Sequence, residues 1–161
     1  MLSKSDKAVK IREGQSLKTD SLETYIRNAM ELPKAHMEVL QFPSGYSNLT
    51  YLLKFGKKEL VLRKPPQGVK IKSGHDMGRE FRILSGLHPL YNRVPQPFLF
   101  SDKLSIIGTP FYIMERMHGV IFRGHTPKDQ LPDLNQMRKL SEAFVSTCLL
   151  YTSPSPRDSD S

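Results

Sequence analysis

The chain has 161 residues, of which 24 are lysine or arginine and 16 are aspartate or glutamate, so its formal net charge is +8. This length suits one domain, and a hydrophobic content of 38% is enough for an ordinary small core. A mean hydropathy of −0.43 and the lack of a long apolar run exclude a transmembrane helix, and the first residues lack a signal-peptide core. The single cysteine, Cys148, cannot form an internal disulfide, which fits a reducing compartment. We expect the cytoplasm, with an organelle left open.

After a polar leader over residues 1–19, the sequence predicts an amphipathic helix. Asp20, followed by Glu23 three residues later, resembles a capping box, and Pro33 sets the far limit of the helix. The apolar residues in between recur at helical spacing: Leu22, Tyr25, Ile26, Ala29 and Met30. We expect this helix to serve packing.

The most informative stretch, residues 42–64, predicts part of an antiparallel sheet. Strands are expected at 37–42, 49–55 and 59–64, with a short connection at 56–58 between the last two. The turn between the first two strands contains a glycine and short polar side chains. Three such strands form a lid that can lie over a polyphosphate.

A second helix is predicted after Pro65 and Pro66, which end the third strand and begin a basic loop. Ser73 is the expected cap of this helix, with Asp76 three residues later. Its apolar face is formed by Met77, Phe81, Leu84 and Leu87.

Beyond that helix, two short strands are expected at 98–102 and 111–114, and a longer helix at 133–150. The tail, residues 151–161, contains two Ser-Pro pairs and predicts neither helix nor strand. One interpretation is a disordered tail with sites for regulatory phosphorylation. The other, which we favour, is that the tail is not native protein sequence, because a helix that still presents core residues rarely gives way to such a segment.

Basic residues concentrate around the third strand. The lysines and arginines that face the single acid Glu59 in this part of the chain are Lys54, Lys57, Lys58, Arg63, Lys64, Lys70 and Lys72. Such a cluster could attract nucleic acid, nucleotide phosphates or an anionic substrate. The alternative is that most of these lysines are solvated on strand edges and oppose aggregation, and the lack of interleaved aromatic residues favours it for each lysine singly.

The turn before the second strand is a candidate phosphate-binding loop. Gly45 permits close approach of the backbone to a ligand, and Ser44, Ser47 and Asn48 offer short polar groups beside main-chain N–H donors. This signal alone is weak, because most turns with one glycine are only turns.

Arg63 makes a phosphate site more specific. If Leu60 and Leu62 are buried, strand alternation turns Arg63 toward the opposite face, beside Val61, which is a candidate roof over a base. A guanidinium there can bind phosphate oxygens or a carboxylate with two bonds at once. Lys64 then points away and is expected in solvent. The alternative for Arg63 is a surface ion pair of little energetic value.

Glu80 falls within the apolar stripe of the second helix, where a carboxylate needs a cation because burying it unpaired is costly. Arg63 is the natural partner. The alternative is a carboxylate at the edge of the stripe that is solvated or paired with Arg79 or Arg82.

Taken together in order and spacing, four runs resemble the aminoglycoside-phosphotransferase-like enzymes, which have the protein-kinase-like fold: FPSGYSNLTYLL, ELVLRKPP, GREFRILSGL and IIGTPFYIMERMHGVIF. The resemblance covers residues 12–145 and is greatest to the branch found alone in bacteria and joined to acyl-CoA dehydrogenases in eukaryotes. It implies an α+β fold. Residues 20–119 would form a kinase-like N-terminal lobe of antiparallel sheet plus helix, with the hinge, and residues 120–150 would begin the helical C-terminal lobe.

The resemblance also implies roles for the residues already singled out. Residues 44–48 match the nucleotide-covering loop, Arg63 matches the phosphate-binding lysine or arginine of the family, and Glu80 matches its helix partner. The implied cofactors are ATP and Mg²⁺, and the implied partners are a nucleotide and a small-molecule hydroxyl acceptor.

The strand at 113–117 matches the hinge between the two lobes of the family. By this resemblance, the Glu115 carbonyl and the Met117 N–H would meet the adenine edge, with Met114 at the back of the pocket. Without the resemblance, a buried apolar strand that ends at Gly119 is more often just a strand.

The catalytic groups of the family have no match in this chain. Phosphoryl transfer requires an acid to orient the acceptor hydroxyl and side chains to hold magnesium. The family supplies them from its second lobe, in a His-Gly-Asp-like segment, a following asparagine and a further aspartate. The acids after Gly119 lie in no such context: Asp129, Asp133, Glu142, Asp158 and Asp160. We therefore expect no catalytic residue in this chain and no magnesium ligands.

Three hypotheses of function remain. The first is a fragment of an ATP-dependent phosphotransferase that acts on a small-molecule hydroxyl, for which the resemblance suggests a hydroxyacyl-CoA. It predicts weak nucleotide binding at best, no turnover by the chain itself, and apolar surface left exposed on its last helix. The alternative is a non-catalytic basic module that binds nucleic acid or an anionic protein, but it leaves Glu80 unexplained. The third is a pseudokinase-like regulatory protein with a native Ser-Pro tail. On the first, which we favour, neither a nucleic acid nor a membrane is an expected partner.

Overall fold

The computed structural model describes residues 7–43, 48–66, 76–119 and 131–152. The chain divides into two compact units, Met1–Ile121 and Phe122–Ser161. The predictions made for Ser44, Gly45 and Ser47, and those for lysines 70 and 72, lie outside the described residues.

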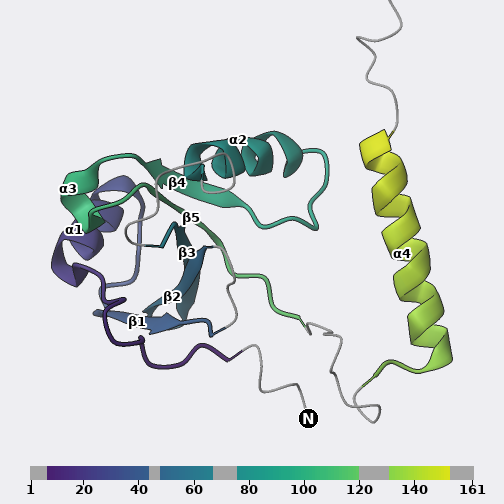
Figure 1. Cartoon of the computed structure of the whole chain (residues 1–161), viewed down its shortest axis with the longest axis horizontal. Coiled ribbons are helices and arrows are strands. Elements are labelled where there is room, and N and C mark those ends of the chain that lie inside the picture. Colours follow the sequence, from purple (N-terminus) through teal and green to yellow (C-terminus); the bar gives the residue numbers. More distant parts are fainter. Residues whose placement is uncertain (1–6, 44–47, 67–75, 120–130, 153–161) are drawn as a thin grey trace, which may run out of the picture. The chain divides into compact units, whose positions relative to one another are not determined.

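The first unit is built on a five-stranded sheet in which every neighbouring pair is antiparallel, in the order β1-β2-β3-β5-β4 (Figure 1). Its strands are β1 Met37–Gln41, β2 Leu49–Phe55, β3 Lys58–Lys64, β4 Pro97–Ser101 and β5 Phe111–Glu115. The predicted strand limits are confirmed to within one residue at each end. The turn between β2 and β3 needs Gly56, whose φ of +61° lies in the left-handed region.

Helices cover both faces of this sheet (Figure 1). The helix α1 (Thr19–Ala29) packs together with the short α3 (Leu104–Ile107), and α2 (Met77–Leu87) packs on β4 and β5. The sequence did not predict α3, because one helical turn is too short to show a period. The α+β class with an antiparallel sheet is confirmed.

The hydrophobic core lies between the sheet and the pair α1 and α3. Strand alternation sends one set of side chains into it, with Leu22 and Ile26 from α1 and Ile106 and Ile107 from α3 opposite. The buried strand residues of this face are Met37, Leu49, Tyr51, Leu53, Phe55, Leu60, Leu62, Phe111 and Ile113. Leu60 and Leu62 are both fully buried, as expected, so the alternate positions Val61 and Arg63 turn to the face that carries α2.

Lys64 contradicts its prediction. It was expected in solvent, but only 2% of it is exposed, because the same alternation that buries Leu62 directs Lys64 to the core face of β3. Its cross-strand partner is Leu49, which is also buried. Burial lowers the pKa of the Lys64 ammonium, since the charged form loses hydration. No ion pair to Lys64 is found within the described residues.

Both predicted helix caps are wrong. The N-cap of α1 is Lys18, without a side-chain cap, and Glu23 instead accepts hydrogen bonds from Arg27 in the next turn. The N-cap of α2 is Asp76, whose carboxylate accepts from the Arg79 N–H at 2.8 Å. In the first case a strong cation four residues away competes successfully for the carboxylate. In the second, the helix begins three residues later than expected, so Asp76, the predicted capping-box partner, is itself the cap.

The second unit contains α4 (Leu134–Thr152), in agreement with the predicted helix. Its start has a capping box in which Asp133 and Gln136 exchange side-chain to backbone hydrogen bonds of 2.8 and 3.1 Å. Apolar residues of the helix are exposed: Leu134, Met137, Leu140, Phe144 and Val145. Among the described residues, no helix has both the length and the apolar content that a membrane span needs.

Candidate functional site

A charged pair joins β3 to α2 on the face of the sheet opposite the core. The Arg63 Nε lies 3.1 Å from the Glu80 Oε2, so the ion pair expected from the apolar stripe of α2 is present. About a third of each side chain remains exposed, 34% for Arg63 and 30% for Glu80. The pair is therefore reachable by a ligand and partly shielded from water.

Two neutral donors complete the surroundings of the Glu80 carboxylate. The Asn48 side-chain amide donates to Oε1 at 3.0 Å, and the Tyr112 hydroxyl donates to Oε2 at 2.9 Å. Both donors are buried, with 3% and 2% of the residue exposed. Burial, together with the neighbouring Glu80 charge, raises the pKa of the Tyr112 hydroxyl, so it stays protonated and keeps donating.

The Arg63 guanidinium is held at one edge only. Its Nε is buried and close to Glu80, but outside hydrogen-bond geometry. Within the described residues, its two terminal nitrogens have no hydrogen-bond partner. Guanidinium nitrogens bind phosphate or carboxylate oxygens with two parallel bonds, so the terminal nitrogens of Arg63 are chemically suited to an anion.

An apolar surface adjoins the pair on the same face. Val61 and Met114 are cross-strand partners on β3 and β5, and Val61 is 7% exposed. Leu52 on β2 pairs with Val61 from the other side and is 3% exposed. The sequence identified Val61 and Met114 but missed Leu52, whose position opposite Val61 depends on the β2–β3 register.

The segment after β5 is tied to the sheet by backbone and charge. The Glu115 N–H donates to the Gln96 carbonyl at 2.8 Å, and Met117 is 50% exposed. Between them, Arg116 lies 3.2 Å from the Glu59 carboxylate and stacks over the Phe42 ring at 5.5 Å. Glu115 therefore ends β5 directly after Met114, and Met117 follows two residues beyond the strand.

The family is decided by comparison with known proteins. A model of the phosphotransferase enzyme family named APH matches residues 38–144, which include β2 to β5, α2 and all of β1 but its first residue. The chain belongs to this family. The predicted resemblance to aminoglycoside phosphotransferases with a branch joined to acyl-CoA dehydrogenases is thereby confirmed.

Two relatives support the resemblance to the branch joined to acyl-CoA dehydrogenases. This APH-family chain is 37% identical over 130 residues to acyl-CoA dehydrogenase family member 10 of Mus musculus, and 40% identical over 109 residues to family member 11 of Rattus norvegicus. These matches cover 80% and 64% of this chain but 12% and 14% of the relatives.

A solved structure supports the fold. It is a Ralstonia eutropha protein assigned as an aminoglycoside phosphotransferase, similar with a TM-score of 0.57 and 27% sequence identity. The similarity covers 74% of this chain and 32% of that one.

The described residues of the APH-family chain do not form a metal site. No group of three or more histidine, cysteine or acidic side chains that could hold a metal is found among them. Glu80 is the carboxylate nearest to Arg63 within the part described, and both its oxygens already accept protein hydrogen bonds. Among the described residues we therefore assign no magnesium ligand.

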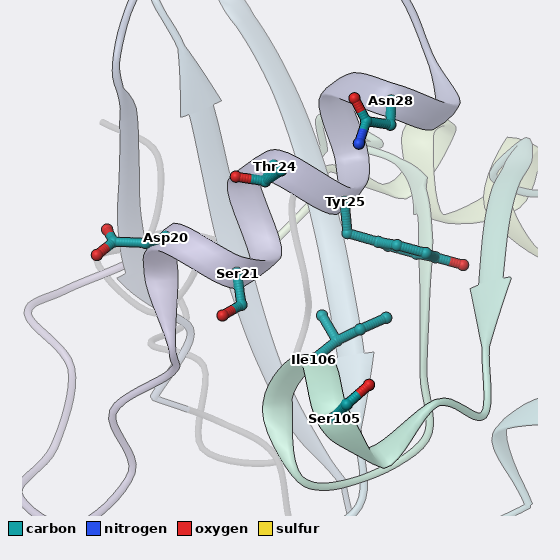
Figure 2. A pocket seen from close by; sticks show the side chains of 7 residues that line it. All are labelled: Asp20, Ser21, Thr24, Tyr25, Asn28, Ser105 and Ile106. Carbon is teal, nitrogen blue, oxygen red and sulfur yellow. The ribbon is translucent and has the colours of Figure 1, made fainter.

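A shallow groove lies on the other face of the sheet, between α1 and α3 (Figure 2). It is lined by Asp20, Ser21, Thr24, Tyr25, Asn28, Ser105 and Ile106. The polar side chains among these are exposed except for the half-buried Tyr25, and they form no network with one another within the described residues. The groove is remote from Arg63, because the sheet and the core lie between them.

Of the ten residues predicted to bind a nucleotide, the structure describes seven. It brings Asn48 and Arg63 each into contact with Glu80, and it places Val61 and Met114 opposite each other on β3 and β5. Glu115 and Met117 lie at the end of β5. Tyr112 was missed, although its position two residues before Met114 on a predicted strand places both on one face.

Proposed function

We propose that the first unit forms the ATP-binding half of a phosphotransferase that transfers the γ-phosphate to a small-molecule hydroxyl. The observation that carries this proposal is the Arg63–Glu80 pair, braced by Asn48 and Tyr112 and bordered by the apolar Val61–Met114 surface. A nucleotide has the same division, with anionic phosphates at one end and a flat apolar base at the other.

In this arrangement Arg63 binds phosphate oxygens through its terminal nitrogens, and Glu80 keeps the guanidinium in place. Phosphoryl transfer depends mainly on positioning and on neutralising charge, so a held cation beside the phosphates is a direct contribution to it. Val61 and Met114 contact the base. Residues 44–48 cover the phosphates, and the Glu115 carbonyl with the Met117 N–H binds the adenine edge.

The groups that activate the acceptor hydroxyl are not among the residues assigned here. Mg²⁺, when bound in enzymes of this kind, neutralises charge on the transferred phosphate. Since neither acceptor-activating groups nor magnesium ligands are assigned among the described residues, we propose that this chain by itself binds nucleotide weakly and turns nothing over. Detectable transfer of phosphate from ATP to any acceptor by the purified chain would contradict this.

For the acceptor we propose a hydroxyacyl-CoA. Support comes from the names of the relatives. They are called acyl-CoA dehydrogenase family members, and an acyl-CoA is a CoA thioester. The chain spans a small share of those relatives, so its acceptor is tested best in a longer form of the protein. The measurement compares phosphorylation of hydroxyl-bearing CoA thioesters with phosphorylation of aminoglycosides, and faster phosphorylation of the CoA thioesters is expected.

The test of nucleotide binding is calorimetric titration of the full chain with ATP. Arg63→Ala is expected to weaken binding roughly 10–100-fold, the value of one or two charge-assisted hydrogen bonds. The ATP affinity of Arg63→Lys is expected to lie between those of the wild type and Arg63→Ala, since a lysine keeps the charge but not the planar edge. The control is Arg79→Ala, which removes an exposed arginine from α2 with the same change of net charge.

Equal affinities for the Arg63→Ala and Arg79→Ala variants would overturn the assignment of Arg63. A uniform small loss of affinity for a polyanion such as heparin, with no ATP binding by the wild type, would favour the basic binding module instead. The structure offers that module limited support. Lys54 pairs with Glu38 at 2.9 Å, Lys58 lies over the Phe98 ring, and Lys64 is buried.

A further inference from the structure

We propose, on the basis of the proposed function, that Asn48 and Tyr112 are positioning residues for the nucleotide. They hold the Glu80 carboxylate in the one orientation that turns the terminal nitrogens of Arg63 toward the phosphates. Neither needs to touch the nucleotide for this role.

The two donors define the carboxylate geometrically because they bind different oxygens. Asn48 occupies Oε1 at 3.0 Å and Tyr112 occupies Oε2 at 2.9 Å. A glutamate side chain on a helix otherwise chooses among several rotamers, and its terminal torsion is broad. Two hydrogen bonds from fixed donors fix both the position and the plane of the carboxylate, and therefore the edge that it presents to Arg63.

Burial separates the donors from the ion pair. Asn48 and Tyr112 are 3% and 2% exposed, whereas the Arg63 and Glu80 side chains are 34% and 30% exposed. An ion pair that is open to water contributes little on its own and does not hold two long side chains in one geometry. The buried neutral donors provide the directional constraint that the pair lacks.

The donors also connect α2 to the sheet. Tyr112 is the direct cross-strand partner of Arg63, and Asn48 immediately precedes β2, so both are fixed relative to Arg63 by the strand register. The other contacts of α2 include the Phe81 ring, which lies 5.9 Å from Phe100 and 6.4 Å from Tyr112. Apolar ring contacts of this kind tolerate small rotations of a helix, and hydrogen bonds to Glu80 do not.

A purely structural role is the competing explanation, because buried polar groups need partners in any fold. It predicts that removing a donor lowers stability and leaves the nucleotide affinity of the folded protein unchanged. Positioning predicts a change in affinity that disappears when Glu80 is absent. The two roles are therefore separable.

The first experiment is a double-mutant cycle on the full chain, read by titration with ATP. Tyr112→Phe removes only the hydroxyl and is expected to weaken ATP binding about 5–10-fold in the wild-type background, in the usual range of coupling between contacting residues. In a Glu80→Ala background the same change is expected to have no effect. Asn48→Ala frees the other oxygen and serves if Tyr112→Phe does not fold. Because Asn48 also belongs to the loop assigned to the phosphates, its effect on ATP affinity is expected to shrink, but not to vanish, in the Glu80→Ala background.

The matched control is Tyr51→Phe. Tyr51 is a fully buried tyrosine of the same sheet, and its hydroxyl donates to the Gln15 carbonyl at 2.8 Å on the core face. Its removal is expected to cost similar stability without changing ATP affinity. Equal effects of Tyr51→Phe and Tyr112→Phe on affinity would overturn the proposal.

The second experiment does not need a nucleotide. The Nε–H signal of Arg63 in a ¹⁵N-labelled chain, assigned by its loss in Arg63→Lys, reports the buried nitrogen next to Glu80. Tyr112→Phe and Asn48→Ala are expected to shift this signal and to speed its exchange with water several-fold, and Tyr51→Phe is expected to leave it alone. If the wild type binds no ATP, the proposed function fails, but this signal still shows whether Asn48 and Tyr112 fix the position of Arg63. An Arg63 signal unchanged in both variants overturns the positioning role.

Discussion

The two faces of the sheet carry different kinds of side chain although they alternate along the same strands. Toward α1 and α3, β2, β3 and β5 present a nearly continuous apolar surface that is closed to water. Toward α2, the same strands present Arg63 and Tyr112 beside Val61 and Met114, and the charged pair is a third exposed.

This difference shows how one small domain separates stability from binding. The apolar face stabilises by burying area, which is insensitive to direction. The α2 face depends on donors and acceptors placed to within hydrogen-bond geometry, which is what anion recognition needs. Substitutions on the two faces are therefore expected to have different signatures, and they can be ordered by size.

The largest expected effect is on the apolar face. Phe111→Ala deletes a fully buried ring that also packs edge-on against Tyr25 at 6.1 Å, and should lower the free energy of unfolding by roughly 3–5 kcal/mol. Urea denaturation measures it. At temperatures where the variant is folded, its ATP affinity should equal that of the wild type. A variant that stays folded but loses ATP affinity would contradict the assignment of stability to one face and of binding to the other.

Glu80→Ala on the α2 face should have a mixed effect. It leaves the Tyr112 hydroxyl and the Asn48 amide without their acceptor, which should cost roughly 1–3 kcal/mol of stability. It also frees Arg63 and should weaken ATP binding at least about tenfold. Denaturation and titration on the same sample give both values. Glu38→Ala, which removes an exposed acid from β1, is the control and should leave ATP affinity unchanged.

Among the described residues, Lys64 is the only charged side chain buried on the apolar face, and removing it should stabilise the protein. Lys64→Met keeps the stem and should raise the unfolding free energy by roughly 1–3 kcal/mol at pH 7, the usual cost of a buried polar group without a partner. Lys57→Met, at an exposed turn position, is the control. No gain in stability would mean that the ammonium is compensated in the folded chain.

The pH dependence of stability should also identify Lys64. Burial lowers its pKa in the folded chain, whereas the unfolded chain keeps the ordinary value of 10.5, so the unfolded state binds more protons between those two values. Stability should therefore rise with pH through that window, and Lys64→Met should remove the rise. The measurement should stay below pH 10, because burial raises the pKa of Tyr51 to about 12 and ionisation of tyrosine in the unfolded chain then lowers stability.

The smallest expected effect concerns the exposed pair of Lys54 and Glu38, which lies 2.9 Å apart on neighbouring strands. Lys54→Ala should change the unfolding free energy by about 0–1 kcal/mol, less at high salt, and should not alter ATP affinity. Thermal unfolding at low and high salt tests this. A large loss of ATP binding in this variant would favour the hypothesis that the basic residues around β3 bind the anion together.

Much of the fold could be predicted because its signals are local. The strand limits follow from alternation and turns, and the pairing of Arg63 with Glu80 follows from a carboxylate within an apolar stripe. The caps could not be predicted, since Glu23 was equally able to reach the helix start or Arg27, and only the folded geometry chose. The burial of Lys64 was missed because a lysine at a strand end is usually solvated.

The sequence by itself determined the family, the antiparallel sheet and the charged pair, because each follows from the spacing of residues or from short runs of sequence. Only the tertiary structure decided that Asn48 and Tyr112 converge on Glu80. Each lies 32 residues from Glu80 along the chain, in opposite directions. Their meeting depends on β5 pairing with β3 and on α2 packing across that face, and these contacts are long-range consequences of burying the core.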